Sequence, residues 1–395
     1  MRASWIEAAL IAGGAIVGWY ATRRWRLSAE PAPRPPSRDY LAGLNYLVNE
    51  QPDRAVEAFL RAVAVDQDTV ETQFALGALF RRRGEVDRAI RVHQNLIARE
   101  QLDPAFREQA TYALAQDYQR AGLYDRAEKL LLELASGGTY RIAALKDLVG
   151  LYEVERDWER AIAIHKDLAR IGKPDQPTAI AHYYCELAET ARAAGDTAKA
   201  RDLLRTARGE QRRNPRAALL RADVALDLGE ADHAIKLLKK VPVQSPQLAG
   251  EVLPRLVRAL KAAGREAELP VVVAELAGDG REVADALAYA AILTGALDSP
   301  ALLALARAFL GREPAIAEIV GALLPDGAVL EDAALARLCA AIRRQAQRAA
   351  RFRCGECGFS SSGFFWQCPG CKSWDSLKPL SPSDLAGQVG AAHGR

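Results

Sequence analysis

Residues 114–131 read LAQDYQRAGLYDRAEKLL, and variants of this stretch recur along the chain. The most regular feature is a small residue in its second half, within segments such as DRAVEAF, DRAIRVH and DHAIKLL. Successive copies of this residue are 34, 38, 34, 39 and 34 positions apart. The alanines concerned are Ala55, Ala89, Ala127, Ala161, Ala200 and Ala234. A period of this length indicates one supersecondary unit repeated in series.

Each repeat is expected to be a pair of antiparallel helices. The alanine lies in the second helix, and the first helix carries a small residue in pairs such as Leu76-Gly77 and Leu114-Ala115. The turn between the helices contains Gly84, Gly122, Gly195 or Gly229. Small residues let the helices cross closely, and an aromatic side chain at Tyr46, Phe80, Tyr118 or Tyr152 fills the space between them. The period is that of tetratricopeptide (TPR) repeats, so the sequence predicts an all-α superhelical solenoid.

The array is expected to cover residues 39–276 in about seven units, the last of them degenerate and centred on Gly264. Extra residues at Leu102-Asp103-Pro104 and from Pro174 to Pro177 explain the two longer intervals as loops. Residues 277–351 then continue in helical pairs. They end in an amphipathic helix from Glu331 to Phe352, whose apolar face carries Leu335, Leu338, Cys339 and Ile342.

Residues 352–380 contain two C-x-x-C pairs. Cys354 and Cys357 are separated from Cys368 and Cys371 by ten residues, enough for a short hairpin that returns the second pair to the first. This spacing predicts a tetrahedral four-cysteine site for one metal ion, and Gly358 suits a left-handed turn after the first pair. So short a segment cannot fold on apolar burial alone. The metal is expected to hold it together, with five aromatic side chains collapsed around it: Phe359, Phe364, Phe365, Trp366 and Trp374.

The four cysteine ligands do not identify the metal. Sulfur-only tetrahedral coordination suits zinc or a single iron ion, and iron would permit electron transfer whereas zinc would not. A pair of disulfides, or a redox dithiol with unrelated cysteines nearby, are alternative interpretations. Two C-x-x-C pairs at this spacing favour the metal site over both alternatives.

The N-terminal stretch WIEAALIAGGAIVGWYA, residues 5–21, is apolar except for Glu7 and is followed by Arg23, Arg24 and Arg26. Positive charge after the apolar core favours an uncleaved anchor over a signal peptide. The positive-inside rule then places the rest of the chain in the cytoplasm. We therefore expect a transmembrane anchor at residues 1–22, a basic, Pro-rich, extended linker at 23–38 and a disordered tail at 381–395.

Composition narrows the functional classes. A net charge of +3 on 395 residues gives no electrostatic case for binding nucleic acid. Six cysteines, four of them needed as thiolates, favour a reducing compartment. Cys185 and Cys339 read as core residues, and packing explains His93 and His165, which occupy equivalent repeat positions. Because no catalytic triad, phosphate loop or paired-carboxylate motif stands out, the sequence predicts a protein that is not an enzyme.

An anchor ending GWYATRR, a TPR array and a terminal RCGECGF…FWQCPGCKSWDSLKP occur here in one order. This combination resembles the lipopolysaccharide assembly protein B family over essentially the whole chain. The terminal motif looks like a rubredoxin-type knuckle pair with metal ligands Cys354, Cys357, Cys368 and Cys371, but Lys372 stands where free rubredoxins usually have glycine.

The resemblance implies a single-pass inner-membrane adaptor whose bulk lies on the cytoplasmic side. In that family the adaptor helps the membrane protease FtsH degrade the deacetylase that commits precursor to lipid A, and so restrains lipopolysaccharide synthesis. Two other functions fit the same features. One is a membrane-tethered rubredoxin-type electron-transfer protein, and the other is a general scaffold for other lipopolysaccharide-synthesis or transport proteins.

The concave face of the solenoid, formed by the first helices of the repeats, is the surface best suited to protein partners. The repeat register places on it Arg81, Tyr112, Gln116, Gln119, Lys146, His182 and Arg192. Polar changes on this face are expected to alter stability by at most about 0.5 kcal/mol. The metal module is expected to dock against the array.

Overall fold

The computed structural model describes residues 38–49, 51–65, 70–172, 176–278, 280–295, 297, 300–312, 331–348 and 350–380. The expected membrane anchor at residues 1–22, the Pro-rich linker up to residue 37 and the tail at 381–395 lie outside these ranges. Among the described helices, none combines the length and the apolar composition needed to cross a bilayer. The chain divides into two compact units, Met1–Leu151 and Tyr152–Arg395.

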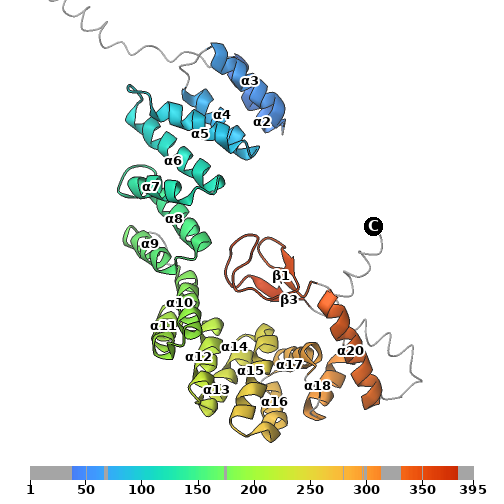
Figure 1. Cartoon of the computed structure of the whole chain (residues 1–395). Helices are drawn as coiled ribbons and strands as arrows, with labels where there is room; N and C mark the ends of the chain where they lie inside the picture. Colours follow the sequence, from blue (N-terminus) through green and yellow to red (C-terminus); the bar gives the residue numbers. More distant parts are fainter. Residues whose placement is uncertain are drawn as a thin grey trace, which may run out of the picture. The chain divides into compact units, whose positions relative to one another are not determined.

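The first unit consists of helical pairs, as the repeats predict (Figure 1). In it α2 (Arg38–Val48) packs on α3 (Pro52–Val65), α4 (Val70–Arg82) on α5 (Val86–Ile97), and α6 (Pro104–Arg120) on α7 (Tyr124–Ala135). The helix α8 (Arg141–Glu155) follows and extends past the end of the unit. Contacts of α3 with α4 and of α5 with α6 join successive pairs into one stack.

The second unit continues the helical pairs and ends in a small sheet (Figure 1). Its first helices are α9 (Trp158–Arg170), α10 (Pro177–Ala193), α11 (Thr197–Glu210), α12 (Pro215–Asp227), α13 (Ala231–Leu238) and the short α14 (Lys240–Gln244). They are followed by α15 (Ala249–Ala262), α16 (Leu269–Gly278), α17 (Arg281–Thr294), α18 (Pro300–Leu310) and α20 (Asp332–Arg348). The pairs α10 with α11, α12 with α13, and α17 with α18 are in close contact.

Small residues allow these helices to pack closely. All six repeat alanines are completely buried. At Gly77 a β-carbon would lie only 2.5 Å from Nε2 of His93, so a larger residue would have to displace this buried ring. The four predicted turn glycines have φ between 74° and 82°, a left-handed conformation that favours glycine. The repeat prediction is confirmed at the level of individual residues.

The apolar core of the second unit runs through several helices without a break. One cluster of buried side chains extends from Leu219 on α12 to Leu302 on α18. The helix α20 adds Leu335 and Cys339, each 1% exposed, which pack with Phe309 of α18. These are the residues expected on its apolar face. The solenoid core thus reaches the helix that precedes the metal module.

The metal module forms a three-stranded antiparallel sheet in the order β2-β1-β3. The strands are β1 (Phe352–Cys354), β2 (Ser360–Ser361) and β3 (Leu377–Pro379). Register pairs Phe352 with Ser361 and Cys354 with Leu377. The first C-x-x-C pair runs from Cys354, the last residue of β1, into the loop before β2, and the second pair lies in the loop between β2 and β3.

Candidate metal centre and its docking surface

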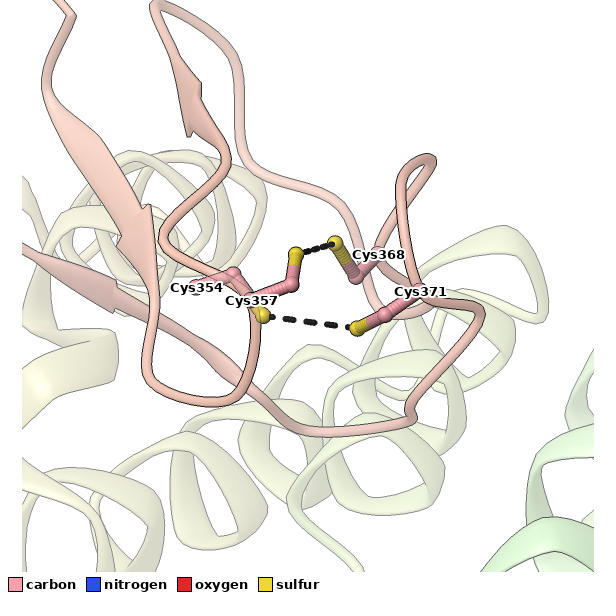
Figure 2. A group of neighbouring side chains, drawn as sticks. All are labelled: Cys354, Cys357, Cys368 and Cys371. Atoms are coloured by element: carbon pink, nitrogen blue, oxygen red, sulfur yellow. Dashed lines mark hydrogen bonds between the residues drawn. The ribbon is translucent and has the colours of Figure 1, made fainter. Parts of the chain in front are cut away.

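The module brings its four cysteines together. Their sulfur atoms all lie within 4.8 Å of one another, and Figure 2 shows the two C-x-x-C loops facing each other. Cys354 Sγ lies 3.7 Å from Cys371 Sγ, and Cys357 Sγ lies 3.7 Å from Cys368 Sγ. A tetrahedron with metal–sulfur bonds of about 2.3 Å has edges of about 3.8 Å, whereas a disulfide needs about 2.05 Å. The donor set therefore fits one metal ion and not a pair of disulfides.

Backbone geometry in both loops directs N–H groups at sulfur. The N–H groups of Glu356 and Cys357 donate to Cys354 Sγ, and the N–H of Ser373 donates to Cys371 Sγ. Gly358 has φ 75°, the left-handed turn expected after the first pair, and Lys372 has φ 62° at the corresponding place after the second. These donors stabilise negative charge on the sulfurs, which metal binding requires.

Two serines add to this effect. Ser376 Oγ lies 3.3 Å from Cys354 Sγ, and this hydrogen bond together with backbone donation lowers the pKa of Cys354 to about 6. Ser373 Oγ lies 3.4 Å from Cys371 Sγ and lowers the pKa of that thiol in the same way. Both pKa shifts favour the thiolate form that metal binding requires. Cys354 is buried and Cys371 is exposed, so one edge of the site faces solvent.

The aromatic side chains divide between two roles, which corrects the expectation that all five collapse around the metal. Phe359 and Phe364 pack against the buried ligands Cys354 and Cys368. Phe365 is 44% exposed. Trp366 and Trp374 pack instead against the repeat helices. The physical reason is space, because a module of this size has no interior large enough for two indoles.

Trp374 is the main contact between the module and the array. Its indole Nε1 donates to Glu153 Oε1 of α8 over 3.2 Å. Its ring stacks on His182 of α10, with centroids 4.6 Å apart and planes 13° apart. The rings of Trp158 and Tyr183 meet it edge-on at 6.3 and 5.9 Å. Tyr183 also donates to Glu153 Oε1 over 2.7 Å, so this carboxylate links the module to two repeat side chains.

Trp366 makes a second contact. It packs on the continuous core of the second unit and lies 5.8 Å from the His182 ring. The guanidinium of Arg216 lies 5.9 Å from the Trp366 centroid. Arg216 is only 3% exposed and is held by Glu186 and Glu189 at 2.8 and 3.0 Å. The expected docking of the module is thus made of aromatic stacking over a charged group that is already paired.

Three of the predicted partner-binding residues lie around one carboxylate in the first unit. Tyr112 and Gln116 hydrogen-bond to the Asp147 side chain, and Gln119 Nε2 donates to the Asp147 carbonyl over 3.3 Å. Burial, followed by the hydrogen bond to Asp147, raises the pKa of Tyr112 to about 12. Burial also raises the pKa of Asp147. Asp147 was not predicted from the sequence, because nothing in its sequence surroundings distinguishes it from the many other acidic residues in the helices.

The other predicted partner-binding residues have different surroundings. Arg81 Nη1 donates to Asp117 over 2.7 Å, and Asp117 is completely buried. Lys146 is exposed on α8. His182 is completely buried under Trp374, with Nε2 only 3.0 Å from Asp375 Oδ1. Arg192 pairs with Asp227 and lies 3.9 Å from Asp223. A binding role for these residues stays a prediction.

Glu153 and Arg216 complete the docking surface, and neither was predicted. A usable signal was present in the module itself. Two tryptophans within the nine residues from Trp366 to Trp374 exceed what so small a fold can bury. Their excess apolar area indicates a partner surface, although the sequence does not identify which repeat supplies it.

Family models match three parts of the chain. A model described as a rubredoxin metal binding domain matches residues 352–379. Tetratricopeptide repeat models match residues 40–104 and 191–263. They agree with the helical pairs and the four-sulfur cluster described above. They establish the modules but not yet the family of the whole chain.

The whole chain has relatives of matching length. Lipopolysaccharide assembly protein B of Escherichia coli K12 is 32% identical over 383 residues, which cover 95% of this chain and 98% of the relative. The chain belongs to the lipopolysaccharide assembly protein B family. The Haemophilus influenzae member is 30% identical over 398 residues, covering 93% of this chain and 96% of the relative. Lipopolysaccharide assembly is therefore the process in which the family places this protein.

Among solved structures, a kinesin light chain of Podosopora anserina with TPR-like repeats is 22% identical to this chain, with a TM-score of 0.32. It covers 45% of this chain and 97% of its own length. The assignment of this chain to the lipopolysaccharide assembly protein B family rests on the relatives of matching length.

Proposed function

We propose that the protein is an inner-membrane adaptor that restrains lipopolysaccharide synthesis. It would do so by presenting the committed-step deacetylase of lipid A synthesis to the membrane protease FtsH. The observation that carries this proposal is the family match over 95% of the chain, which includes both the repeats and the metal module. Helical repeats present extended surfaces for protein segments, which is the chemistry that an adaptor needs.

The architecture supports action by proximity. The apolar stretch at residues 5–21 would anchor the chain in the membrane, with the repeats and the metal module on the cytoplasmic side. Tethering raises the effective concentration of a repeat surface beside a membrane-bound partner. The metal's role is structural, because it fixes the loops that carry Trp366 and Trp374 against the array.

The cluster of Tyr112, Gln116 and Gln119 around Asp147 is the proposed partner surface of the first unit. Its hydrogen bonds hold these side chains in fixed positions, which lowers the entropy cost of binding. Lys146 adds an exposed positive charge on the same helix as Asp147.

The decisive experiment measures the half-life of the deacetylase after protein synthesis is stopped. A strain lacking this protein should show a longer half-life and excess lipopolysaccharide, and the intact gene should restore both. An unchanged half-life in the deletion strain refutes the adaptor function. If only Gln116→Ala with Gln119→Ala leaves the half-life unchanged, the choice of surface is wrong and the adaptor function stands.

The exposed edge of the metal site favours one rival function, electron transfer through a single iron ion. Cys357 and Cys371 are solvent-exposed, as an electron donor to another protein requires. Replacing the metal by zinc separates the two functions, because zinc has no accessible second oxidation state. A zinc-loaded protein that still shortens the deacetylase half-life rejects the electron-transfer role.

A further inference from the structure

A hollow of about 370 Å³ lies between α11, α12 and α13 in the second unit. Its polar lining consists of Arg201, Arg205, Arg208, Arg221, His233 and Glu230. Its floor is apolar and includes the buried side chains of Leu204 and Val224. The volume falls within the range of small-molecule sites, about 300 to 1,000 Å³. The hollow therefore combines an excess of positive charge with an apolar base.

Among the described residues, neighbouring carboxylates form ion pairs with only two of the four arginines of the hollow. Arg201 Nη1 lies 3.8 Å from Glu230, and Arg205 Nη1 lies 2.9 Å from Asp202. Arg208 and Arg221 form no ion pair with any residue in the described part of the chain. Two guanidinium groups on facing helices are thus left to share the hollow.

Their proximity is unfavourable in the free protein. Burial lowers the pKa of Arg221, and the neighbouring Arg208 lowers it further. Both causes act against a charge that arginine nevertheless keeps at neutral pH. A bound anion would remove this penalty, because it supplies the missing counter-charge to both groups.

We infer that this hollow binds a ligand bearing a phosphate group, held between Arg208 and Arg221, with the rest of the ligand over Leu204 and Val224. Phosphate fits because each guanidinium can donate two parallel hydrogen bonds to its oxygens and because one phosphate can neutralise both charges. A soluble phosphorylated compound and a phospholipid headgroup share this chemistry. The site goes beyond the proposed function, since it would let a small ligand act on the adaptor.

The test is calorimetric titration of the full-length protein in non-ionic detergent. The probes are glycerol 3-phosphate and dihexanoyl phosphatidic acid, which carry the same phosphate without and with acyl chains. Arg208→Gln with Arg221→Gln should weaken binding of whichever probe binds by at least about tenfold. The matched control is Arg212→Gln with Arg213→Gln, two exposed arginines outside the hollow, which removes the same charge and should change the Kd less than about twofold.

Binding of both probes identifies a soluble ligand class, and binding of the lipid alone identifies a headgroup; either result with this variant pattern supports the site. No binding up to about 10 mM of either probe, or an equal loss in the control, overturns it. Circular dichroism checks the fold of the double variant. Should it melt earlier than the intact protein, Arg208→Gln alone gives the answer, because this side chain is exposed and its removal leaves no partner unpaired.

Discussion

Lys372 has a backbone φ of 62°, in the left-handed region that costs a non-glycine residue about 1 to 2 kcal/mol. This explains in physical terms why glycine is usual there in free rubredoxins. We expect Lys372→Gly to stabilise the module by about 0.5 to 1 kcal/mol, since glycine's extra freedom when unfolded offsets part of the gain. Urea unfolding, monitored by tryptophan fluorescence, measures this change in the free energy of unfolding. Lys372→Ala removes the charge but keeps the strain, so an equal gain from alanine would contradict this explanation.

The four sulfurs act as one set. Cys354→Ser should abolish stoichiometric metal binding, because a hydroxyl cannot replace a thiolate in a sulfur-only site. Elemental analysis of the purified protein gives the metal content. Cys339→Ala is the matched control, since Cys339 packs in the core away from the metal ligands and its loss should leave the metal in place. Normal metal content in the serine variant would show that the four cysteines are not the site.

Between elements, the pair of Arg81 on α4 and Asp117 on α6 leads us to expect an effect on stability larger than the limit of about 0.5 kcal/mol expected for polar changes on the concave face. Asp117 is completely buried and also lies 2.5 Å from His93 Nδ1. Arg81→Glu should therefore lower the free energy of unfolding by about 3 kcal/mol, because it places a second carboxylate beside a buried one. Lys146→Glu, on an exposed position, should change it by less than about 0.5 kcal/mol. Equal effects in urea unfolding would contradict the structure.

Trp374 makes more of the contacts of the metal module with α8 and α10 than Trp366 or Asp375 does. Trp374→Ala should loosen the contact of the module with the array while the metal stays bound, since Trp374 contributes contacts but no ligand atom. Hydrogen exchange should then rise in α10 around His182, which loses its cover. Phe365→Ala changes an exposed aromatic of the same module and should leave exchange unaltered. Protection of α10 that survives the loss of Trp374 would show that other contacts suffice.

For the molecule as a whole, deletion of residues 1–26 tests the proposed tether. The shortened protein should stay helical and bind metal, because the repeats and the module lie beyond the deletion. It should no longer shorten the deacetylase half-life, because the effective concentration at the membrane is lost. Full activity of the truncated protein at native abundance would show that these residues are dispensable.

The sequence predicted the structure correctly wherever a residue type in a pattern has a single structural explanation. The repeat alanines and turn glycines predicted the helical pairs, and cysteine spacing predicted the metal site. It failed where the partner of a side chain lies far away in the chain. The residues next to Glu153 and Arg216 in the sequence do not distinguish them from solvent-exposed charges. They also do not indicate that Trp374 and Trp366 of the module contact these two side chains. Asp117 was missed for the same reason, because its burial depends on two other helices.

The hydrogen bond from Trp374 to Glu153 joins residues 221 positions apart. A helical solenoid ordinarily folds from local contacts alone, so its early repeats can form while later ones are still being made. The contact between Trp374 and Glu153 is not local, because the ribosome releases Trp374 only after nearly the whole chain has been synthesised. A chain that ends before Trp374 lacks the indole that stacks on His182 of α10. The contact of Trp374 with Glu153 and His182 can therefore form only late in synthesis, after the repeats that it joins.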